Sequence, residues 1–265
     1  MTQVLNPRGI SMDIRYTLSR QELGLTAALD IAAELHSRLI RQAHVRMIFA
    51  AAPSQSEMLQ HLVDQPGIDW SRITAFHMDE YLGLPTGTPQ LFGEWLRAAI
   101  FDRLPFAAVH LIETGGDPAL ACRRYAELLH QAPVDLCLLG IGSNGHLAFN
   151  DPPADLNDPL PVKVVALTQE CRQQQVDDAC FSLIDDVPTQ AITLTIPTLL
   201  AADRLFCCVP SALKARAVHS MVHDEINGAS PATALRLHPN CTVYLDSDSA
   251  ARLGQGYMAK TQDER

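Results

Sequence analysis

Short apolar runs alternate along the chain with stretches whose apolar residues recur at helical spacing. The apolar runs have the length of strands and occupy residues 45–52, 73–78, 109–112, 134–142, 162–167, 204–210 and 241–246. Amphipathic stretches follow them, for example SQSEMLQHLV after the first run and SALKARAVHSMV after the sixth. Nearly continuous apolar strands that alternate with such helices are typical of a mostly parallel sheet covered on both faces. The pattern therefore predicts a doubly wound α/β fold.

One further helix and one long loop complete this organisation. The segment SRQELGLTAALDIAAELHSRLIRQ predicts an amphipathic helix over residues 19–42 that packs on the sheet. The strand–helix pattern continues to about residue 250 without a change in composition, so we predict a single domain over residues 1–265. Residues 150–161 are rich in Pro, Asp and Asn and form an extended loop, a kind of segment that is often functional.

The overall charge narrows the class of partner. The formal net charge of −10 disfavours a nucleic-acid surface or a basic membrane patch. An anionic small molecule stays compatible with it, because a pocket needs only a few local cations. No apolar stretch approaches the roughly 18 residues of a membrane span, and the N-terminus lacks the pattern of a signal peptide. We predict a cytoplasmic protein with neither nucleic-acid nor membrane partners.

The Cys and His residues do not indicate a metal site. The seven cysteines include no CxxC pair, and several lie in apolar runs, as expected of buried thiols in a reducing compartment. His219 and His223 are four residues apart on an expected helix, a spacing that can hold a metal. Their neighbours do not form HExxH, so a solvated helix face is the better interpretation.

Polar residues that follow the apolar runs are the candidates for chemistry, because ligands of such sheets bind at the carboxyl ends of strands. Asp79 and Glu80 come directly after the second run. One carboxylate can face the crevice while the other points away from it. A carboxylate in a partly desolvated pocket has a raised pKa and can abstract a proton beside a carbonyl. The alternative is that Asp79 caps the next element and Glu80 is solvated.

A glycine-rich turn follows the fourth run in LGIGSNGHLAFNDPP, residues 139–153. Its glycines let the backbone turn sharply and present His146. Asp151 follows five residues later and can hold the imidazole in one tautomer. A carboxylate–histidine pair is a common general base. The alternative is a structural histidine that is hydrogen-bonded to the loop.

Anion binding has weaker support from the pattern. Ser54 lies where a strand meets a helix N-terminus, whose free N–H groups favour an anion. Its loop, AAPSQ, is neither a Walker motif nor a dinucleotide fingerprint. Arg172 and Lys214 each begin a helical stretch after a strand. From the residues alone, both are better explained as ordinary surface cations.

Two long motifs resemble those of the glucosamine-6-phosphate deaminase family, a branch shared with 6-phosphogluconolactonases. FHMDEYLGLP is similar to the family's MDEY motif, and LGIGSNGHLAFNDPP to its G-x-G-x-[DN]-G-H-x-[AG]-F-N-E-P motif. They occur in the order of the family, and the resemblance runs from about residue 45 to 250. It implies a Rossmann-like α/β fold, in agreement with the strand pattern.

The resemblance also implies roles for individual residues. Asp79 would move a proton between C2 and C1 of an amino-sugar phosphate, and His146, assisted by Asn144 and Asp151, would open the sugar ring. LTQECR resembles the segment that supplies a phosphate-binding Arg, which gives that role to Arg172. PSALKA resembles the segment of a phosphate-binding Lys, which gives it to Lys214. Ser54 falls near the family's phosphate loop.

The chain departs from the family pattern at three places. AAPSQ replaces the usual TGxTP loop, so Ala52 and Pro53 stand in a phosphate loop that usually contains glycine. Asp151 replaces the usual Glu and is one methylene shorter. The loop ADLNDPLP lacks the usual Ser/Arg-rich continuation, which leaves the sugar open.

Together these observations predict a cytoplasmic enzyme that converts glucosamine 6-phosphate, or a close relative, to fructose 6-phosphate and ammonia. We expect no cofactor, no metal and a small sugar phosphate as the partner, with a homo-oligomer as an open possibility. The alternatives are a 6-phosphogluconolactonase-type hydrolase, another phosphosugar isomerase and a non-catalytic phosphosugar sensor. The MDEY segment disfavours the lactonase, and the presence of both Asp79 and His146 disfavours the sensor.

Overall fold

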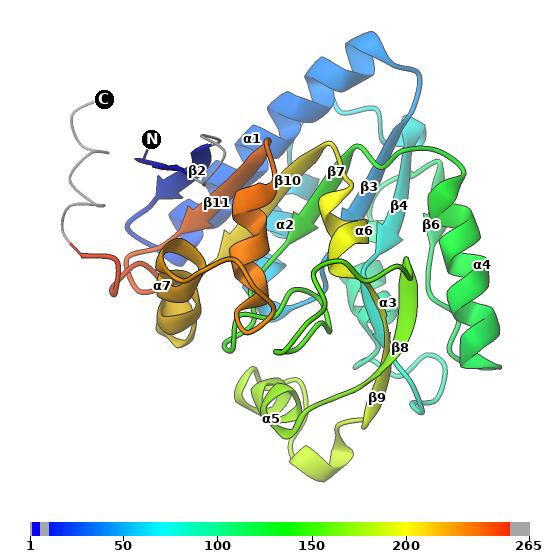
Figure 1. The fold of residues 1–265 in the computed structure, drawn as a ribbon. Coiled ribbons are helices and arrows are strands. Elements are labelled where there is room, and N and C mark those ends of the chain that lie inside the picture. Colours follow the sequence, from blue (N-terminus) through cyan, green and yellow to red (C-terminus); the bar gives the residue numbers. More distant parts are fainter. Residues whose placement is uncertain (1, 6–10, 255–265) are drawn as a thin grey trace.

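Seven parallel strands and one antiparallel edge strand form the main sheet of the computed structural model, which describes residues 2–5 and 11–254 (Figure 1). In spatial order the strands are β1 (Thr2–Leu5), β2 (Ser11–Tyr16), β11 (Cys241–Leu245), β10 (Arg204–Val209), β7 (Leu136–Leu139), β3 (Val45–Phe49), β4 (Ile73–His77) and β6 (Ala108–His110). Only the pairing of β1 with β2 is antiparallel in this sheet. The predicted α/β class is confirmed.

Helices bury both faces of this sheet. On β3, Ile48 belongs to one core cluster while Met47 and Phe49 belong to the other, because successive side chains of a strand point to opposite faces. The first cluster is covered by α4 (Pro118–His130), α6 (Ile196–Leu200) and α7 (Ala215–His223). The second is covered by α1 (Arg20–Arg41), α2 (Ser56–Val63), α3 (Phe92–Leu96) and α5 (Gln169–Asp177). This arrangement explains why the strands are nearly continuous apolar runs.

Helix α1 matches the helix predicted over residues 19–42. Ser19 caps its first turn by accepting the backbone N–H of Glu22 at 3.2 Å, and Arg38 and Arg41 occupy its last turn, where basic side chains complement the helix dipole. That the whole chain is one domain stays a prediction, because residues 1, 6–10 and 255–265 lie outside the described residues. Across the described ranges no helix is both long and apolar enough to cross a bilayer.

A second, smaller sheet was not predicted. It contains β5 (Asp79–Tyr81), β9 (Gln190–Leu194) and β8 (Val162–Ala166), paired antiparallel (Figure 1). The apolar run at residues 162–167 therefore lies outside the main parallel sheet. Its side chains alternate between less and more exposed positions, as expected of a strand with one solvated face. Residues 246–254, which follow β11, form turns rather than a helix.

The order of the strands fixes the place of a ligand site. From β3 the chain continues outward to β4 and β6, and it then returns to β7 on the other side of β3. The carboxyl ends of β3 and β7 therefore flank the point at which the strand order reverses. Doubly wound sheets bind their ligands in the crevice at this point.

Candidate active site

A pocket lies at the reversal point between β3 and β7. Segments 50–55 after β3 and 140–142 after β7 form its floor, and β5, α5 and the start of α7 contribute to its walls. Four of the predicted site residues line it: Ser54, Asp79, His146 and Lys214. Residues far apart in the sequence thus meet where the sheet topology directs them.

Gly142 creates the space that the His146 ring occupies. A Cβ built on Gly142 would lie 2.2 Å from Cε1 of His146, so any side chain at this position would displace the ring. The turn is closed by hydrogen bonds from Gly142 N to the carbonyl of His146 at 3.0 Å and from Gly145 N to the carbonyl of Gly142 at 3.0 Å. Gly145 has a φ of 87°, a conformation that glycine adopts without strain. The predicted presentation of His146 by glycines is found.

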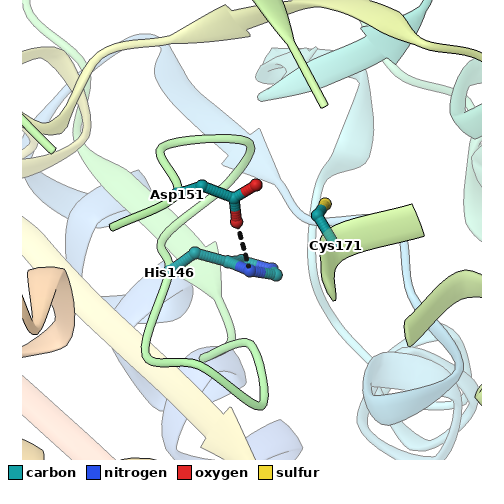
Figure 2. Close-up of side chains that lie close together, drawn as sticks. All are labelled: His146, Asp151 and Cys171. Carbon is teal, nitrogen blue, oxygen red and sulfur yellow. Dashed lines mark ion pairs between the residues drawn. The ribbon is translucent and has the colours of Figure 1, made fainter. Parts of the chain in front are cut away.

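Asp151 and Asn144 lie behind His146 rather than in the pocket. Nδ1 of His146 is 3.2 Å from Oδ1 of Asp151 (Figure 2). The side-chain amide of Asn144 donates to the same oxygen at 3.1 Å, while its own oxygen accepts the backbone N–H of His146 at 3.1 Å. Asp151 therefore reaches His146 directly, although it is one methylene shorter than Glu.

The environment of Asp151 keeps its carboxylate ionised. Thr168 donates its hydroxyl to Oδ2 at 2.7 Å. Burial alone would raise the pKa of Asp151, but the nearby His146 side chain and hydrogen bonds from Thr168 and Asn144 lower it below its usual range. A carboxylate at Nδ1 favours the tautomer that carries the proton there, which leaves Nε2 as the acceptor of the ring.

Asp79 and Glu80 are both buried, with 6% and 3% of their surface exposed. The alternative in which Glu80 is solvated is therefore wrong. Asp79 lines the pocket, whereas Glu80 contacts the start of α3, as expected of successive residues in a strand. Burial, and then the charge of Glu80, raise the pKa of Asp79 well above its usual value. A buried carboxyl group with a raised pKa that lines a pocket is a candidate for acid–base chemistry.

The pocket lining also contains a buried cation. Lys214 is 5% exposed, and burial lowers the pKa of its ammonium group. Near it, the amide of Gln55 donates to Oγ of Ser54 at 3.0 Å and to the carbonyl of Cys208 at 3.2 Å, which fixes the loop after β3. Within the described residues, Lys214 and His146 are the lining residues that can carry positive charge.

Arg172 does not line this pocket. Its guanidinium donates to the backbone carbonyls of Ile184 at 2.6 Å and Val187 at 3.1 Å, and so holds the segment after α5. The side of the pocket formed by α5 and the residue after it carries Gln174, Gln175 and Asp178 instead. Lys214 lines the pocket and Arg172 does not, so the role of Arg172 in binding the phosphate stays a prediction.

Three lining or supporting residues were missed by the sequence analysis. Gln174 accepts hydrogen bonds from the backbone N–H and hydroxyl of Ser143 at 2.8 and 2.9 Å, which ties α5 to the glycine-rich turn. Gln55 is fully buried, and Thr168 supports Asp151. The only sequence signal was local: Thr168 stands where an N-cap is expected before a polar helix, and its side chain does accept the N–H of Cys171.

The donor atoms of His146, Asp151 and Cys171 lie within 4.8 Å of one another, close enough for these residues to hold a metal ion (Figure 2). Both oxygens of Asp151 already accept hydrogen bonds, and Cys171 is fully buried with its thiol pKa raised, first by burial. Loading this set with metal would require the loss of the buried thiol proton. The arrangement suits a catalytic imidazole held by a carboxylate better than a resident metal.

Comparison with known proteins agrees with this geometry. Residues 18–244 match the family described as glucosamine-6-phosphate isomerases/6-phosphogluconolactonase. A glucosamine-6-phosphate deaminase from Exiguobacterium sp. strain AT1b is 33% identical over 234 residues, which cover 88% of this chain and 91% of the relative. The chain belongs to this family. A second relative, a glucosamine-6-phosphate deaminase from Bacillus cereus strain G9842, is 36% identical over 183 residues, which cover 69% of this chain and 68% of that relative.

Solved structures place the chain within the same family fold. A monomeric glucosamine-6-phosphate deaminase superposes with a TM-score of 0.84 at 27% identity, covering 91% of this chain and 99% of the other. The 6-phosphogluconolactonase of Thermotoga maritima superposes with a TM-score of 0.70 at 17% identity, covering 89% and 99%, and so shares the fold. The family resemblance and fold predicted from the two sequence motifs are thereby confirmed.

Proposed function

We propose that the protein is a glucosamine-6-phosphate deaminase that converts glucosamine 6-phosphate, or a close relative, to fructose 6-phosphate and ammonia. The observation that carries this proposal is the meeting of two bases of different kind in one pocket. Asp79 is a buried carboxyl with a raised pKa, and His146 is an imidazole held by Asp151 at 3.2 Å. An aldose-to-ketose conversion needs one base for ring opening and one for proton transfer between carbons.

Lys214 anchors the phosphate of the substrate in this proposal. Its buried ammonium group lines the pocket. The loop that carries Ser54 lines the same pocket and leads into α2. The N–H groups at the start of a helix complement an anion, and a desolvated cation binds phosphate strongly. Arg172, which the resemblance also assigned to the phosphate, acts here by holding the segment around Ile184 and Val187.

His146 opens the sugar ring. With Nδ1 of the imidazole facing Asp151, Nε2 accepts the proton of the anomeric hydroxyl and donates it to the ring oxygen as the C1–ring-oxygen bond breaks. Asn144 supports this step indirectly, because it fixes both the backbone N–H of His146 and the carboxylate of Asp151. The product of the step is the open-chain aldehyde form of the amino sugar.

Asp79 then moves the proton between C2 and C1. As a carboxylate it removes the C2 proton to give an enolamine, and as a carboxylic acid it returns a proton to C1. The resulting ketose imine adds water and releases ammonia, which leaves fructose 6-phosphate. The raised pKa of Asp79 suits both halves of this transfer. None of these steps uses a cofactor or a metal.

A lactonase is the main competing activity, since the family contains both. The curated relatives at 33% and 36% identity are named deaminases, whereas the Thermotoga lactonase shares 17% identity and thus supports the fold alone. A phosphosugar sensor without catalysis does not need a buried carboxyl of raised pKa beside a histidine–carboxylate pair. We propose further that the enzyme works in the cytoplasm, and a homo-oligomer remains compatible with this function.

A panel assay tests the proposal. Ammonia release is measured from amino-sugar phosphates that differ at C4, with the ketose phosphate measured in parallel and 6-phosphogluconolactone as the competing substrate. We expect equal amounts of ammonia and ketose phosphate from glucosamine 6-phosphate or a close relative. Hydrolysis of the lactone without ammonia release from any amino sugar would replace the deaminase with the lactonase.

A further inference from the structure

The geometry points to Glu80 as a positioning residue, whose buried carboxylate fixes the start of α3 and the end of β5 around Asp79. Oε1 of Glu80 accepts the backbone N–H groups of Tyr81 and Phe92, both at 2.9 Å. Oε2 accepts the backbone N–H of Gly93 at 2.8 Å. One side chain thus satisfies two N–H groups in the first turn of a helix, which have no partner within the helix. This role rests on the proposed function, since it acts through Asp79.

The contact at Gly93 leaves no spare room. A Cβ built on Gly93 would lie 3.3 Å from Oε2 of Glu80 and 3.1 Å from Cδ1 of Leu111. A side chain at this position would therefore press against the carboxylate. The glycine allows the first turn of α3 to approach Glu80 closely enough for a 2.8 Å hydrogen bond. The pair is built as a unit, although the residues are 13 positions apart.

The turn that Glu80 holds forms a wall of the pocket. Phe92 lines the pocket, stacks on Phe149 with ring centroids 5.5 Å apart and packs on Tyr81 with centroids 4.7 Å apart. The hydroxyl of Tyr81 in turn donates to Gln175 of α5 at 2.7 Å. Displacement of Glu80 would therefore shift both the part of the pocket lining that Phe92 forms and the strand that carries Asp79.

Glu80 also acts on Asp79 through its charge. Burial raises the pKa of Glu80 to about 7, while the three N–H donors oppose this rise and favour the carboxylate. A carboxylate at Glu80 disfavours ionisation of the adjacent Asp79 and raises its pKa. Besides burial, the charge of Glu94 of α3 raises the pKa of Glu80. The charges of Asp79 and Glu80 in turn raise, after burial, the pKa values of Tyr81 of β5 and Tyr125 of α4, and that of Asp79 raises the pKa of Cys171 of α5. Lys214, His146 and Asp178 face the pocket that Asp79 lines.

Two variants separate the charge of Glu80 from its reach. Glu80→Gln keeps the length of the side chain and removes its charge, which should lower the pKa of Asp79. The acid limb of the pH profile of kcat/KM should therefore move to lower pH. Glu80→Asp keeps the charge but is one methylene too short for the helix start, so the limb should stay while kcat falls on the order of tenfold through misplacement. KM should change less than kcat in both, because Lys214 is untouched. Glu127→Gln, which removes an exposed charge on α4, is the matched control and should leave kcat and the limb unchanged.

Amide hydrogen exchange provides a readout that does not depend on the proposed reaction. In the wild-type protein the N–H groups of Phe92 and Gly93 should exchange slowly. Both Glu80 variants should raise the exchange rates of these two groups and leave the exchange rates of the N–H groups of β3 unchanged. A wild-type protein without deaminase activity would overturn the proposed function alone. The role of Glu80 would be overturned if Glu80→Asp kept the wild-type kcat and the slow amide exchange of Phe92 and Gly93. It would also be overturned if the acid limb of the kcat/KM profile shifted equally in both Glu80 variants. If Glu80→Gln does not fold, Glu80→Asp still decides between these outcomes.

Discussion

Nδ1 of His146 lies 3.2 Å from Oδ1 of Asp151, whose second oxygen accepts the hydroxyl of Thr168 at 2.7 Å. The carboxylate therefore has a fixed orientation before any substrate binds. It can hold the imidazole in one tautomer and stabilise the imidazolium that forms when His146 accepts a proton. Preorganisation of this kind is the main source of rate in acid–base enzymes.

Loss of this carboxylate should impair catalysis rather than binding. We predict that Asp151→Asn lowers kcat by about 10²-fold or more, because the amide can stabilise the wrong tautomer. KM should change little, since Asp151 lies behind His146. Steady-state kinetics check this, with Asp155→Asn as the control, an exposed carboxylate in the same loop. Equal effects of the two variants would contradict the assignment.

Asp79 should make the protein less stable as the pH rises. Its pKa is raised in the folded state, so the folded protein favours the protonated form and loses stability as the pH rises through the folded pKa. Asp79→Asn cannot ionise, and we predict a melting temperature above that of the wild type by a margin that grows with pH. Thermal denaturation across the pH range measures this margin. A margin that is constant or shrinks with pH would contradict a raised pKa.

Lys214 should determine the affinity for the phosphate. We predict that Lys214→Ala raises KM for the sugar phosphate by about an order of magnitude or more, because a charged hydrogen bond contributes about 1.5–3 kcal/mol. Arg216→Ala removes an exposed cation two residues away, with 67% of its side chain exposed, and serves as the control. An unchanged KM in Lys214→Ala would place the phosphate elsewhere.

Asp178 should weaken anion binding, because it lines the same pocket as Lys214. We predict that Asp178→Asn lowers KM for the phosphorylated substrate and weakens its dependence on ionic strength. Asp177→Asn, on the neighbouring exposed position, should leave KM unchanged. A rise of KM in Asp178→Asn would show that Asp178 contributes a substrate contact instead.

The fold class and the two catalytic motifs could be predicted because their signals are local. Continuous apolar runs define buried parallel strands, and the glycines at Gly142 and Gly145 are required by the turn itself. Strand ends also predicted that Asp79 and His146 would meet at one edge of the sheet. These inferences depend on a few neighbouring residues and on the topology of the sheet.

The contacts that could not be predicted join segments far apart in the sequence. Arg172 follows a strand in a position typical of a ligand-binding cation, yet its guanidinium donates hydrogen bonds to backbone carbonyls 12 and 15 residues away. From the sequence, Glu80 was equally well explained as a solvated residue, because its partners at the start of α3 lie 12 and 13 positions away. Strand β9 was missed because its apolar run merges with that of α6, so periodicity alone gave no boundary.

The most direct test of the account is turnover of glucosamine 6-phosphate in D₂O by the wild type and by Asp79→Asn. The account predicts that the wild type releases ammonia and fructose 6-phosphate in equal amounts, with solvent deuterium at C1 of the product. Asp79→Asn should bind the substrate but show neither product nor exchange of the C2 proton. Exchange at C2 at the wild-type rate in Asp79→Asn would show that another group is the base and would contradict the central claim.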